Sequence, residues 1–409
     1  MLNKLRGFLS SPRFPIFMIV FVDVLGLGIT IPVLPLFAKN ELRAAAWQIT
    51  TLTSVFFGAQ FFASPFLGRL SDRVGRRPVL IISQAGTLTG LLITGFAPSM
   101  TYLYISRVID GLTGGNFSVA QAYLSDITDE KNRARGLGLV NAAFGLGFVF
   151  GPAFGSLVAS LYGPRVPFLI AAGVSLTTIL LSTFLLPESL PPEKRKLGGA
   201  SSAKSPRSRS IDLFLVPAVV VILIIAFGSQ FAFFSFQTVY VLWTERLVLP
   251  TFSESEVQRV VGAILTLVGV CSIVTQFWLV GPLVRRLGEK KLVVGGNLAR
   301  TGAFTAMALS PTLPAVVLTI PFLSVGGGVA LPALIALLTY ASPPDRRGQT
   351  IGLHQSVAAM GSILGPLLSG FLFENVNPNA PMVAAAAAMG LTVLVGLNIF
   401  RLRIHQPVS

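Results

Sequence analysis

Long apolar stretches alternate with short polar breaks along the whole chain. A helix needs roughly 20 mainly apolar residues to cross a bilayer, and these stretches reach that length. The pattern therefore predicts twelve membrane-spanning helices, at residues 14–37, 47–70, 78–97, 100–125, 136–161, 164–187, 212–243, 257–282, 292–310, 313–340, 350–373 and 381–400. The first stretch is too long for the apolar core of a cleaved signal peptide, so we expect it to remain as a helix.

A long segment rich in Pro, Ser, Lys and Gly interrupts the apolar pattern between Pro187 and Ser210. Such a composition is typical of a flexible linker. We therefore predict an N-terminal six-helix bundle at 1–187, a cytoplasmic linker at 188–211 and a C-terminal six-helix bundle at 212–409.

The two predicted bundles share sequence motifs with the same internal spacing. One motif comprises Gly138, Gly147, Gly151 and Pro152 in the first half, and Gly352, Gly361, Gly365 and Pro366 in the second. Another comprises Gly68, Leu70, Arg73 and Gly75, then Gly281, Leu283, Arg286 and Gly288. Internal repeats of this kind build many transporter folds, with the substrate site near the membrane midplane. We therefore expect an all-α integral membrane protein with two pseudo-symmetric bundles.

Composition and charge agree with this class of protein. Hydrophobic residues make up 53% of the chain and charged residues 11%, and the mean hydropathy is +0.75, whereas about 25% of residues are charged in soluble domains. A net charge of +15 raises the question of nucleic-acid binding. However, most Lys and Arg residues lie in segments on one side of the predicted membrane, as the positive-inside rule requires. We therefore expect both termini in the cytoplasm and no nucleic-acid partner.

Few side chains are available for covalent or metal chemistry. The single cysteine, Cys271, lies in an apolar stretch, and His354 and His405 are far apart in the sequence. We expect no disulfide, no metal site and no cofactor. The few ionisable residues inside the spans form no cluster of catalytic type, so we expect no enzymatic activity and no catalytic residue.

The segment after the second predicted helix reads Gly68-Arg-Leu-Ser-Asp-Arg-Val-Gly-Arg-Arg-Pro-Val-Leu80. It resembles the loop signature of the major facilitator superfamily at every defining position. The resemblance implies a major-facilitator fold and a conformational latch made of Gly68, Asp72, Arg73, Gly75, Arg76, Arg77 and Asp126. In that latch Arg76 pairs with Asp126, and Asp72 faces the start of the helix at 350–373, near Gln349 and Thr350. The alternative is a solvated turn that only sets the topology.

Three ionisable residues lie deep inside predicted helices. Asp23, Arg107 and Asp110 are each roughly 10–15 Å from the membrane surface at about 1.5 Å per residue. Charges at that depth cost several kcal/mol unless they are paired or hydrated, and a carboxyl group there can load and release a proton. We therefore predict proton coupling through these residues. The alternatives are a purely structural pair of Arg107 and Asp110, and an Asp23 permanently paired with Arg107 or Arg300.

Motifs in the first half narrow the family resemblance. Asp23 followed by Pro32 and Pro35 is similar to the first helix of bacterial tetracycline exporters and their twelve-helix drug:proton antiporter relatives. The helix at 136–161 resembles the antiporter motif of exporting members, with Ser156 in place of its final glycine; its residues are Gly138, Gly147, Gly151, Pro152 and Gly155. On physical grounds alone, these small residues indicate only tight helix packing.

The departures from tetracycline exporters concern charged residues. The helix at 78–97 has no acid where those exporters place one, the helix at 257–282 lacks their histidine, and Arg300 stands where an acid is expected. A magnesium-chelated tetracycline cation would require such carboxylates. The resemblance therefore implies the type of transporter and leaves tetracycline open as the substrate.

A polar and aromatic stripe in the helix at 212–243 indicates a ligand pocket. Spacings of three and four residues place the stripe roughly on one helix face, and such pockets combine apolar walls with a few polar groups. With other polar midplane residues, the predicted substrate-binding set is Gln60, Asn116, Asn141, Gln230, Phe233, Phe234, Gln237, Tyr240, Asn297, Arg300 and Gln355. Ordinary helix packing is the alternative for the aromatic residues.

These features predict a proton-coupled antiporter that exports small amphipathic or drug-like molecules by alternating access across a bacterial cytoplasmic membrane. We expect a monomer whose partners are the substrate, protons and the lipid bilayer. The alternative is a proton-coupled symporter that imports a polar or anionic small molecule, because Arg107 and Arg300 would suit an anion.

Overall fold

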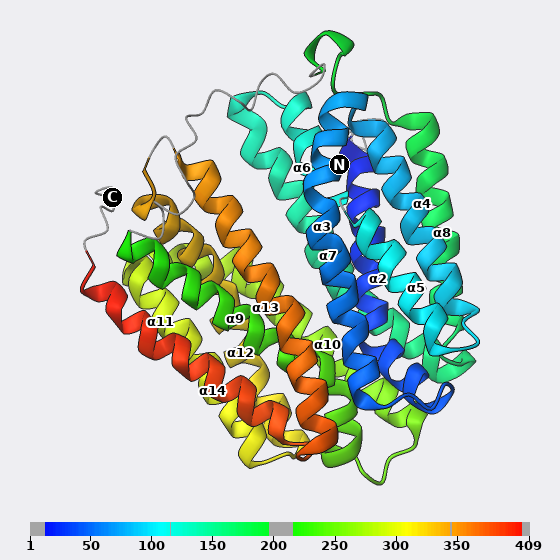
Figure 1. Ribbon diagram of the computed structural model, residues 1–409, viewed down its shortest axis with the longest axis vertical. Coiled ribbons are helices and arrows are strands. Elements are labelled where there is room, and N and C mark those ends of the chain that lie inside the picture. The colour runs from blue at the N-terminus through cyan, green and yellow to red at the C-terminus, as the bar shows by residue number, and fades with distance from the viewer. Residues whose placement is uncertain (1–12, 115, 196–215, 344–345, 403–409) are drawn as a thin grey trace. The chain divides into compact units, whose positions relative to one another are not determined.

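The computed structural model describes residues 13–114, 116–195, 216–343 and 346–402, and their regular secondary structure is helical throughout (Figure 1). Most of the predicted linker at 188–211 lies outside these residues, so that segment stays a prediction.

The α-helices in the first half of the described chain follow the predicted spans closely. They are α2 (Arg13–Asn40), α3 (Ala46–Val74), α4 (Arg76–Gly95), α5 (Met100–Thr113), α6 (Asn116–Ile127), α7 (Glu130–Tyr162) and α8 (Val166–Leu185). A short 3₁₀ helix, Pro192–Lys194, follows α8.

The second half is also helical wherever it is described. Its α-helices are α9 (Pro217–Trp243), α10 (Glu254–Val274), α11 (Val280–Leu309), α12 (Leu313–Ala341), α13 (Arg347–Asn375) and α14 (Ala380–Gly396). Two π-helical turns, Thr244–Val248 and Thr275–Leu279, extend α9 and α10. A 3₁₀ turn, Leu397–Phe400, extends α14.

Nine helical stretches of the described residues are long and apolar enough to cross a membrane by length and composition. One of them, Glu254–Leu309, contains two predicted spans, 257–282 and 292–310. The predicted spans at 47–70 and 100–125 are not among the nine, but both are helical, as α3 and as α5 with α6.

One predicted helix is divided. The span at 100–125 was expected to be continuous, but α5 ends at Thr113 and Gly114 leaves the helical conformation, with φ −69° and ψ 36°. Glycine weakens a helix by about 1 kcal/mol relative to alanine, and a helix end leaves carbonyl groups without helical partners. Gln60 of α3 supplies one such partner, because its Nε2 donates to the Gly114 carbonyl oxygen at 2.8 Å.

Contacts between helices divide the chain into two compact units. Unit 1 comprises Met1–Ala44, Val55–Pro206 and Glu254–Thr266, and unit 2 comprises Ala45–Ser54, Arg207–Ser253 and Leu267–Ser409. Each unit therefore contains most of one predicted bundle and the first turns of one helix from the other half, α10 in unit 1 and α3 in unit 2. The bundle boundaries predicted at 187 and 212 stay a prediction.

The same helix contacts recur in both units. In unit 1, α2 packs on α7, and α4 packs on α5 and α8; in unit 2, α9 packs on α13, and α11 packs on α12 and α14. The repeat extends to the backbone, because Gly75 and Gly288 have φ of 110° and 72° and ψ of 163° and 160°. Glycine adopts such positive φ values at no steric cost, so Gly75 permits the chain to reverse between α3 and α4.

Repeated glycines allow two pairs of helices to approach closely. In unit 1, a Cβ atom on Gly151 of α7 would lie 2.7 Å from Cα of Gly28 in α2. In unit 2, a Cβ atom on the repeat-related Gly365 of α13 would lie 2.5 Å from the carbonyl oxygen of Phe231 in α9. Gly138 is different, because within the described part of the chain no atom of another helix lies within 4 Å of the same position. The motif thus fixes the crossing of α2 with α7 and of α9 with α13.

Each unit has its own apolar core. In unit 1 the core joins α2, α4, α6 and α7 and includes Ile16, Leu80 and Leu124. In unit 2 it joins α9, α11 and α12 and includes Ile222 and Val293. Polar side chains such as Arg107 in unit 1 and Arg300 in unit 2 are buried as well.

Candidate functional site

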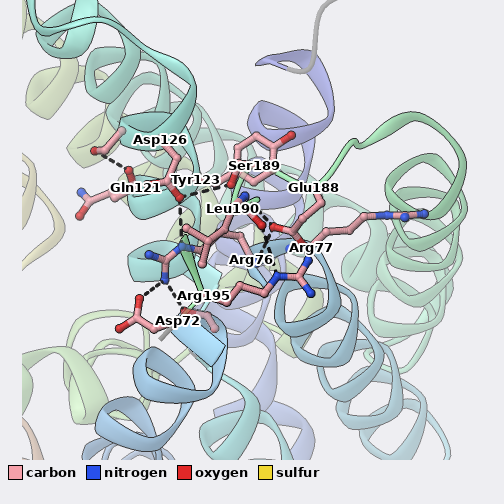
Figure 2. A network of polar contacts seen from close by, with 12 residues as sticks. Asp72, Arg76, Arg77, Gln121, Tyr123, Asp126, Glu188, Ser189, Leu190 and Arg195 are labelled. Carbon is pink, nitrogen blue, oxygen red and sulfur yellow. Dashed lines mark hydrogen bonds and ion pairs between the residues drawn. The ribbon is translucent and has the colours of Figure 1, made fainter. Parts of the chain in front are cut away.

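A network of charged and polar side chains surrounds the reversal between α3 and α4; we call it the loop network (Figure 2). Arg76 is at its centre, with Nη1 2.6 Å from Asp72 Oδ1 and Nε 3.1 Å from Asp126 Oδ2. Arg76 also donates from Nη1 to Ser71 Oγ at 2.7 Å. The predicted contact of Arg76 with Asp126 is therefore present, and it ties the start of α4 to the end of α6.

Sequence reasoning missed the acid that completes the loop network. The Glu188 carboxylate, which follows α8, accepts hydrogen bonds from the backbone N–H groups of Arg76 at 2.8 Å and Arg77 at 3.2 Å. These groups belong to the first turn of α4, where free N–H groups and the helix dipole favour an anion. A Cβ atom on Gly75 would collide with this carboxylate, so Gly75 is required for space as well as for its φ. The sequence shows Glu188 in a polar segment, but nothing in it brings that segment to α4.

The other residues predicted for the latch lie around this network. Arg77 donates to the carbonyl oxygen of Thr183 in α8. Arg73 is exposed, and no described atom of another helix lies within 4 Å of the Cβ position of Gly68. The expected approach of Asp72 to Gln349 and Thr350 concerns both units and stays a prediction.

A second group of polar side chains lies inside unit 1; we call Asp23, Thr87, Arg107 and Asp110 the buried acid site. Thr87 of α4 donates from Oγ1 to Oδ1 of Asp23 in α2 at 3.0 Å. In α5, Nη1 of Arg107 lies 3.3 Å from Oδ2 of Asp110, and the two side chains are 5% and 21% exposed. The Thr87 hydroxyl group also interacts with the Asp110 carboxylate. The three predicted proton-coupling residues therefore lie around Thr87, a residue that sequence reasoning missed.

Small residues of α4 make room for the buried acid site. A Cβ atom on Gly90 would lie 3.4 Å from Cβ of Asp110. Ser106 of α5 donates from Oγ to the Gly90 carbonyl oxygen at 2.9 Å, and it accepts from Nη2 of Arg107 at 3.3 Å. Thr87, Gly90 and Thr94 share one helix face through spacings of three and four residues. That spacing is a signal from which Thr87 could have been found.

The predicted substrate-binding residues separate into several environments. In unit 2 the guanidinium carbon of Arg300 lies 5.7 Å from the centre of the Phe233 ring, and Asn297 donates from Nδ2 to Ser229 Oγ at 3.4 Å. Tyr240 is buried instead among aromatic rings, 5.1 Å from Phe236 and 6.4 Å from Trp243 between ring centres. The stripe of α9 therefore includes a packing residue as well as a candidate ligand contact.

The remaining residues of that set have less specific surroundings. Gln60 contacts the Gly114 carbonyl group at the break after α5, as described above. Phe234 packs edge-on against Phe233 at 5.3 Å. Gln230 and Gln237 are half-buried, and Asn141 and Gln355 are exposed. The side chain of Asn116 lies outside the described residues.

Ser156, which departs from the antiporter motif, makes a contact of its own. Gln258 of α10 donates from Nε2 to Ser156 Oγ at 3.5 Å, and both side chains are buried within unit 1. The neighbouring Gly155 allows α7 to approach Ile29 of α2, with 3.0 Å between its Cβ position and Cα of Ile29. These contacts explain the small residues by packing, and the role of the motif in exchange stays a prediction.

Comparison with known proteins identifies the family. The Major Facilitator Superfamily profile matches residues 16–255 and 246–409. The class C tetracycline resistance protein of Escherichia coli is 30% identical over 391 residues, which cover 93% of this chain and 92% of that protein. Multidrug resistance protein 2 of Bacillus subtilis (strain 168) is 30% identical over 386 residues, with the same coverage of 93% and 92%.

Solved structures show the same fold. The nucleoside transporter NupG has a TM-score of 0.76 at 16% identity, with 96% of this chain and 98% of that chain covered. The human organic anion transporter MFSD10 (TETRAN) has a TM-score of 0.67 at 23% identity, with 94% and 98% covered. The repeated helix packing, the loop network and these similarities lead to one conclusion: this multi-pass membrane protein belongs to the Major Facilitator Superfamily of transporters.

Proposed function

We propose that this transporter is a proton-coupled antiporter that exports small amphipathic or drug-like molecules by alternating access. The observation that carries the proposal is the buried acid site, where Thr87 donates to Asp23 and Arg107 pairs with Asp110. Two carboxyl groups and one arginine inside a membrane domain are energetically costly. Such residues are therefore candidates for a functional role.

The chemistry of the buried acid site suits exchange of a proton for a substrate. Deprotonated Asp110 neutralises the charge of Arg107. Protonated Asp110 does not, so the charge of Arg107 is then unbalanced. A proton that changes this ion pair favours one arrangement of the helices over the other, and a substrate that favours the opposite arrangement is exchanged for it.

The relatives support export as the direction. Proteins named for tetracycline resistance and multidrug resistance are similar to this chain over more than nine tenths of its length. We further propose that the protein acts as a monomer in a bacterial cytoplasmic membrane with both termini in the cytoplasm. The Lys and Arg residues of alternate loops support that orientation.

A second candidate function is proton-coupled import of a polar or anionic molecule. The observation that favours it is the buried position of Arg300, which is 8% exposed. The two functions differ in the direction of proton flow relative to substrate flow.

Transport into proteoliposomes distinguishes export from import. The protein is reconstituted with its cytoplasmic face outward, and uptake of aromatic amphiphiles of positive, zero and negative charge is followed under imposed pH gradients. Antiport predicts accumulation only when the lumen is acidic. Accumulation only when the lumen is alkaline would support the importer and overturn the exporter.

The proposed orientation has its own test. In a Cys271→Ser background, single cysteines replace Ser202 in the predicted linker and Ser99 between α4 and α5. In intact cells an impermeant maleimide should label the cysteine at 99 and not the one at 202. The reverse pattern would overturn the proposed orientation.

A further inference from the structure

Arg300 belongs to α11, and its side chain lies against α12 and α9 of unit 2. Its side chain is 8% exposed, and its stem passes over the backbone of α12, where a Cβ atom on Gly326 would lie 2.9 Å from Arg300 Cγ. On the other side its guanidinium group lies over the Phe233 ring of α9 at 5.7 Å. The Arg300 side chain is therefore packed between the backbone of α12 at Gly326 and the Phe233 ring of α9.

The charge of Arg300 is not balanced within the described part of unit 2. Among the described residues, no carboxylate oxygen lies within 4.0 Å of its nitrogen atoms, whereas Arg107 of unit 1 has Asp110. The described acids of unit 2 are Glu245, Glu289 and Glu374. A ring face contributes about 0.5–2 kcal/mol to a cation, which is less than the several kcal/mol that a charge in a membrane interior costs.

A second polar side chain lies one helical turn before Arg300. Asn297 is 1% exposed, its Oδ1 atom has no hydrogen-bond partner among the described residues, and its Nδ2 atom donates to Ser229 Oγ at 3.4 Å. Residues three apart in a helix share a face, so Asn297 and Arg300 lie on the same side of α11. Helix α11 therefore presents an unbalanced cation and an incompletely bonded amide together.

We propose that Arg300 binds the charged group of an organic anion, so that the exported substrate is an amphipathic carboxylate, sulfonate or phosphate. This proposal rests on the proposed function and specifies its substrate class. A guanidinium group offers a planar fork of N–H donors that matches an oxyanion with two oxygens. The ring of Phe233 offers no oxygen to this group, so its N–H donors remain for the anion, and the rings of Phe233 and Phe234 suit an aromatic substrate body.

Two probes with the same ring and opposite charge test the proposal. Binding of 1-naphthalenesulfonate and of 1-naphthylmethylammonium to the purified full-length protein is measured by calorimetry. We expect the sulfonate to bind at least tenfold more tightly than the ammonium. Arg300→Gln should abolish this preference, and Arg300→Lys should retain part of it, because lysine keeps the charge and loses the fork.

A matched control separates the site from a general effect of charge. Arg246 also lies over an aromatic ring of unit 2, Phe373 at 5.9 Å, but it follows the end of α9. Arg246→Gln should leave both affinities within about twofold of wild type. Equal binding of the two probes by the wild type, or unchanged sulfonate binding by folded Arg300→Gln, would overturn the proposal. If Arg300→Gln does not fold, the preference of the wild type decides.

The outcome separates this proposal from the proposed function. Binding in detergent requires no pH gradient. A protein that prefers the sulfonate but moves it without protons keeps this proposal and overturns antiport. A protein that exchanges protons for the ammonium probe alone keeps antiport and overturns this proposal.

Discussion

Thr87 Oγ1 lies 3.0 Å from Asp23 Oδ1, and the same hydroxyl group interacts with the Asp110 carboxylate. A hydroxyl group has one proton to donate and can accept through its oxygen. When Thr87 donates to Asp23, its single proton is not available to the Asp110 carboxylate. The two acids of the buried acid site therefore compete for one hydroxyl proton, and protonation of one changes the interaction available to the other.

Replacing this hydroxyl group should slow proton-coupled transport. Thr87→Val keeps the shape of the side chain and removes the donor, so we expect the rate of pH-driven uptake to fall roughly tenfold, or about 1.4 kcal/mol in activation free energy. Thr87→Ser should restore most of the rate because it restores the hydroxyl group.

The control for Thr87 is Thr89, which is exposed on the same helix and donates only to the Ala85 carbonyl oxygen at 2.8 Å. Thr89→Val should transport at the wild-type rate. Wild-type transport by Thr87→Val across a range of pH gradients would show that the contact is structural.

Glu188 should stabilise the start of α4. Loss of its carboxylate removes the acceptor for the N–H groups of Arg76 and Arg77, a change comparable to loss of a helix N-cap, about 1–2 kcal/mol. We expect Glu188→Ala to lower the thermal unfolding temperature of the purified protein. Glu193→Ala, at an exposed position in the same segment, should have no effect. Equal unfolding temperatures for the two variants would refute the capping role.

The repeated glycines should be intolerant of a methyl group. Gly151→Ala and Gly365→Ala each place a Cβ atom within 3 Å of backbone atoms of the neighbouring helix. Overpacking of this kind costs typically 1–3 kcal/mol, so both variants should give less folded protein by fluorescence-detected gel filtration. Gly138→Ala, with open space at its Cβ position, should match the wild type. Normal yields of all three would contradict the close helix crossings.

Much of the fold could be predicted from hydrophobic periodicity and repeated motifs, because spanning helices must be long, apolar and internally hydrogen-bonded. The contact of Arg76 with Asp126 was also predicted and is present. The break after α5 was not predicted. Gly114 and Gly115 lie in the middle of a segment whose length and composition otherwise favour one continuous helix.

Contacts between distant segments were beyond sequence reasoning. Glu188 reaches α4 only because the chain after α8 returns to that end of unit 1. In the sequence, Thr87 cannot be distinguished from the other Ser and Thr residues of the helices. Its contact with Asp23 follows only from the packing of α2 against α4. Nothing in the sequence indicated that the Gln60 amide donates to the Gly114 carbonyl oxygen, and substrate binding by Gln60 stays a prediction.

The central claim is that the buried acid site exchanges protons for substrate. The most direct measurement follows the luminal pH of proteoliposomes with a trapped pH-sensitive dye, after the panel compound that the wild type accumulates fastest is added outside. With the cytoplasmic face outward, we predict that substrate entry makes the lumen more alkaline, and that folded Asp110→Asn binds the compound but moves no protons. Substrate entry without a change in luminal pH in the wild type, or an undiminished change in Asp110→Asn, would contradict the account.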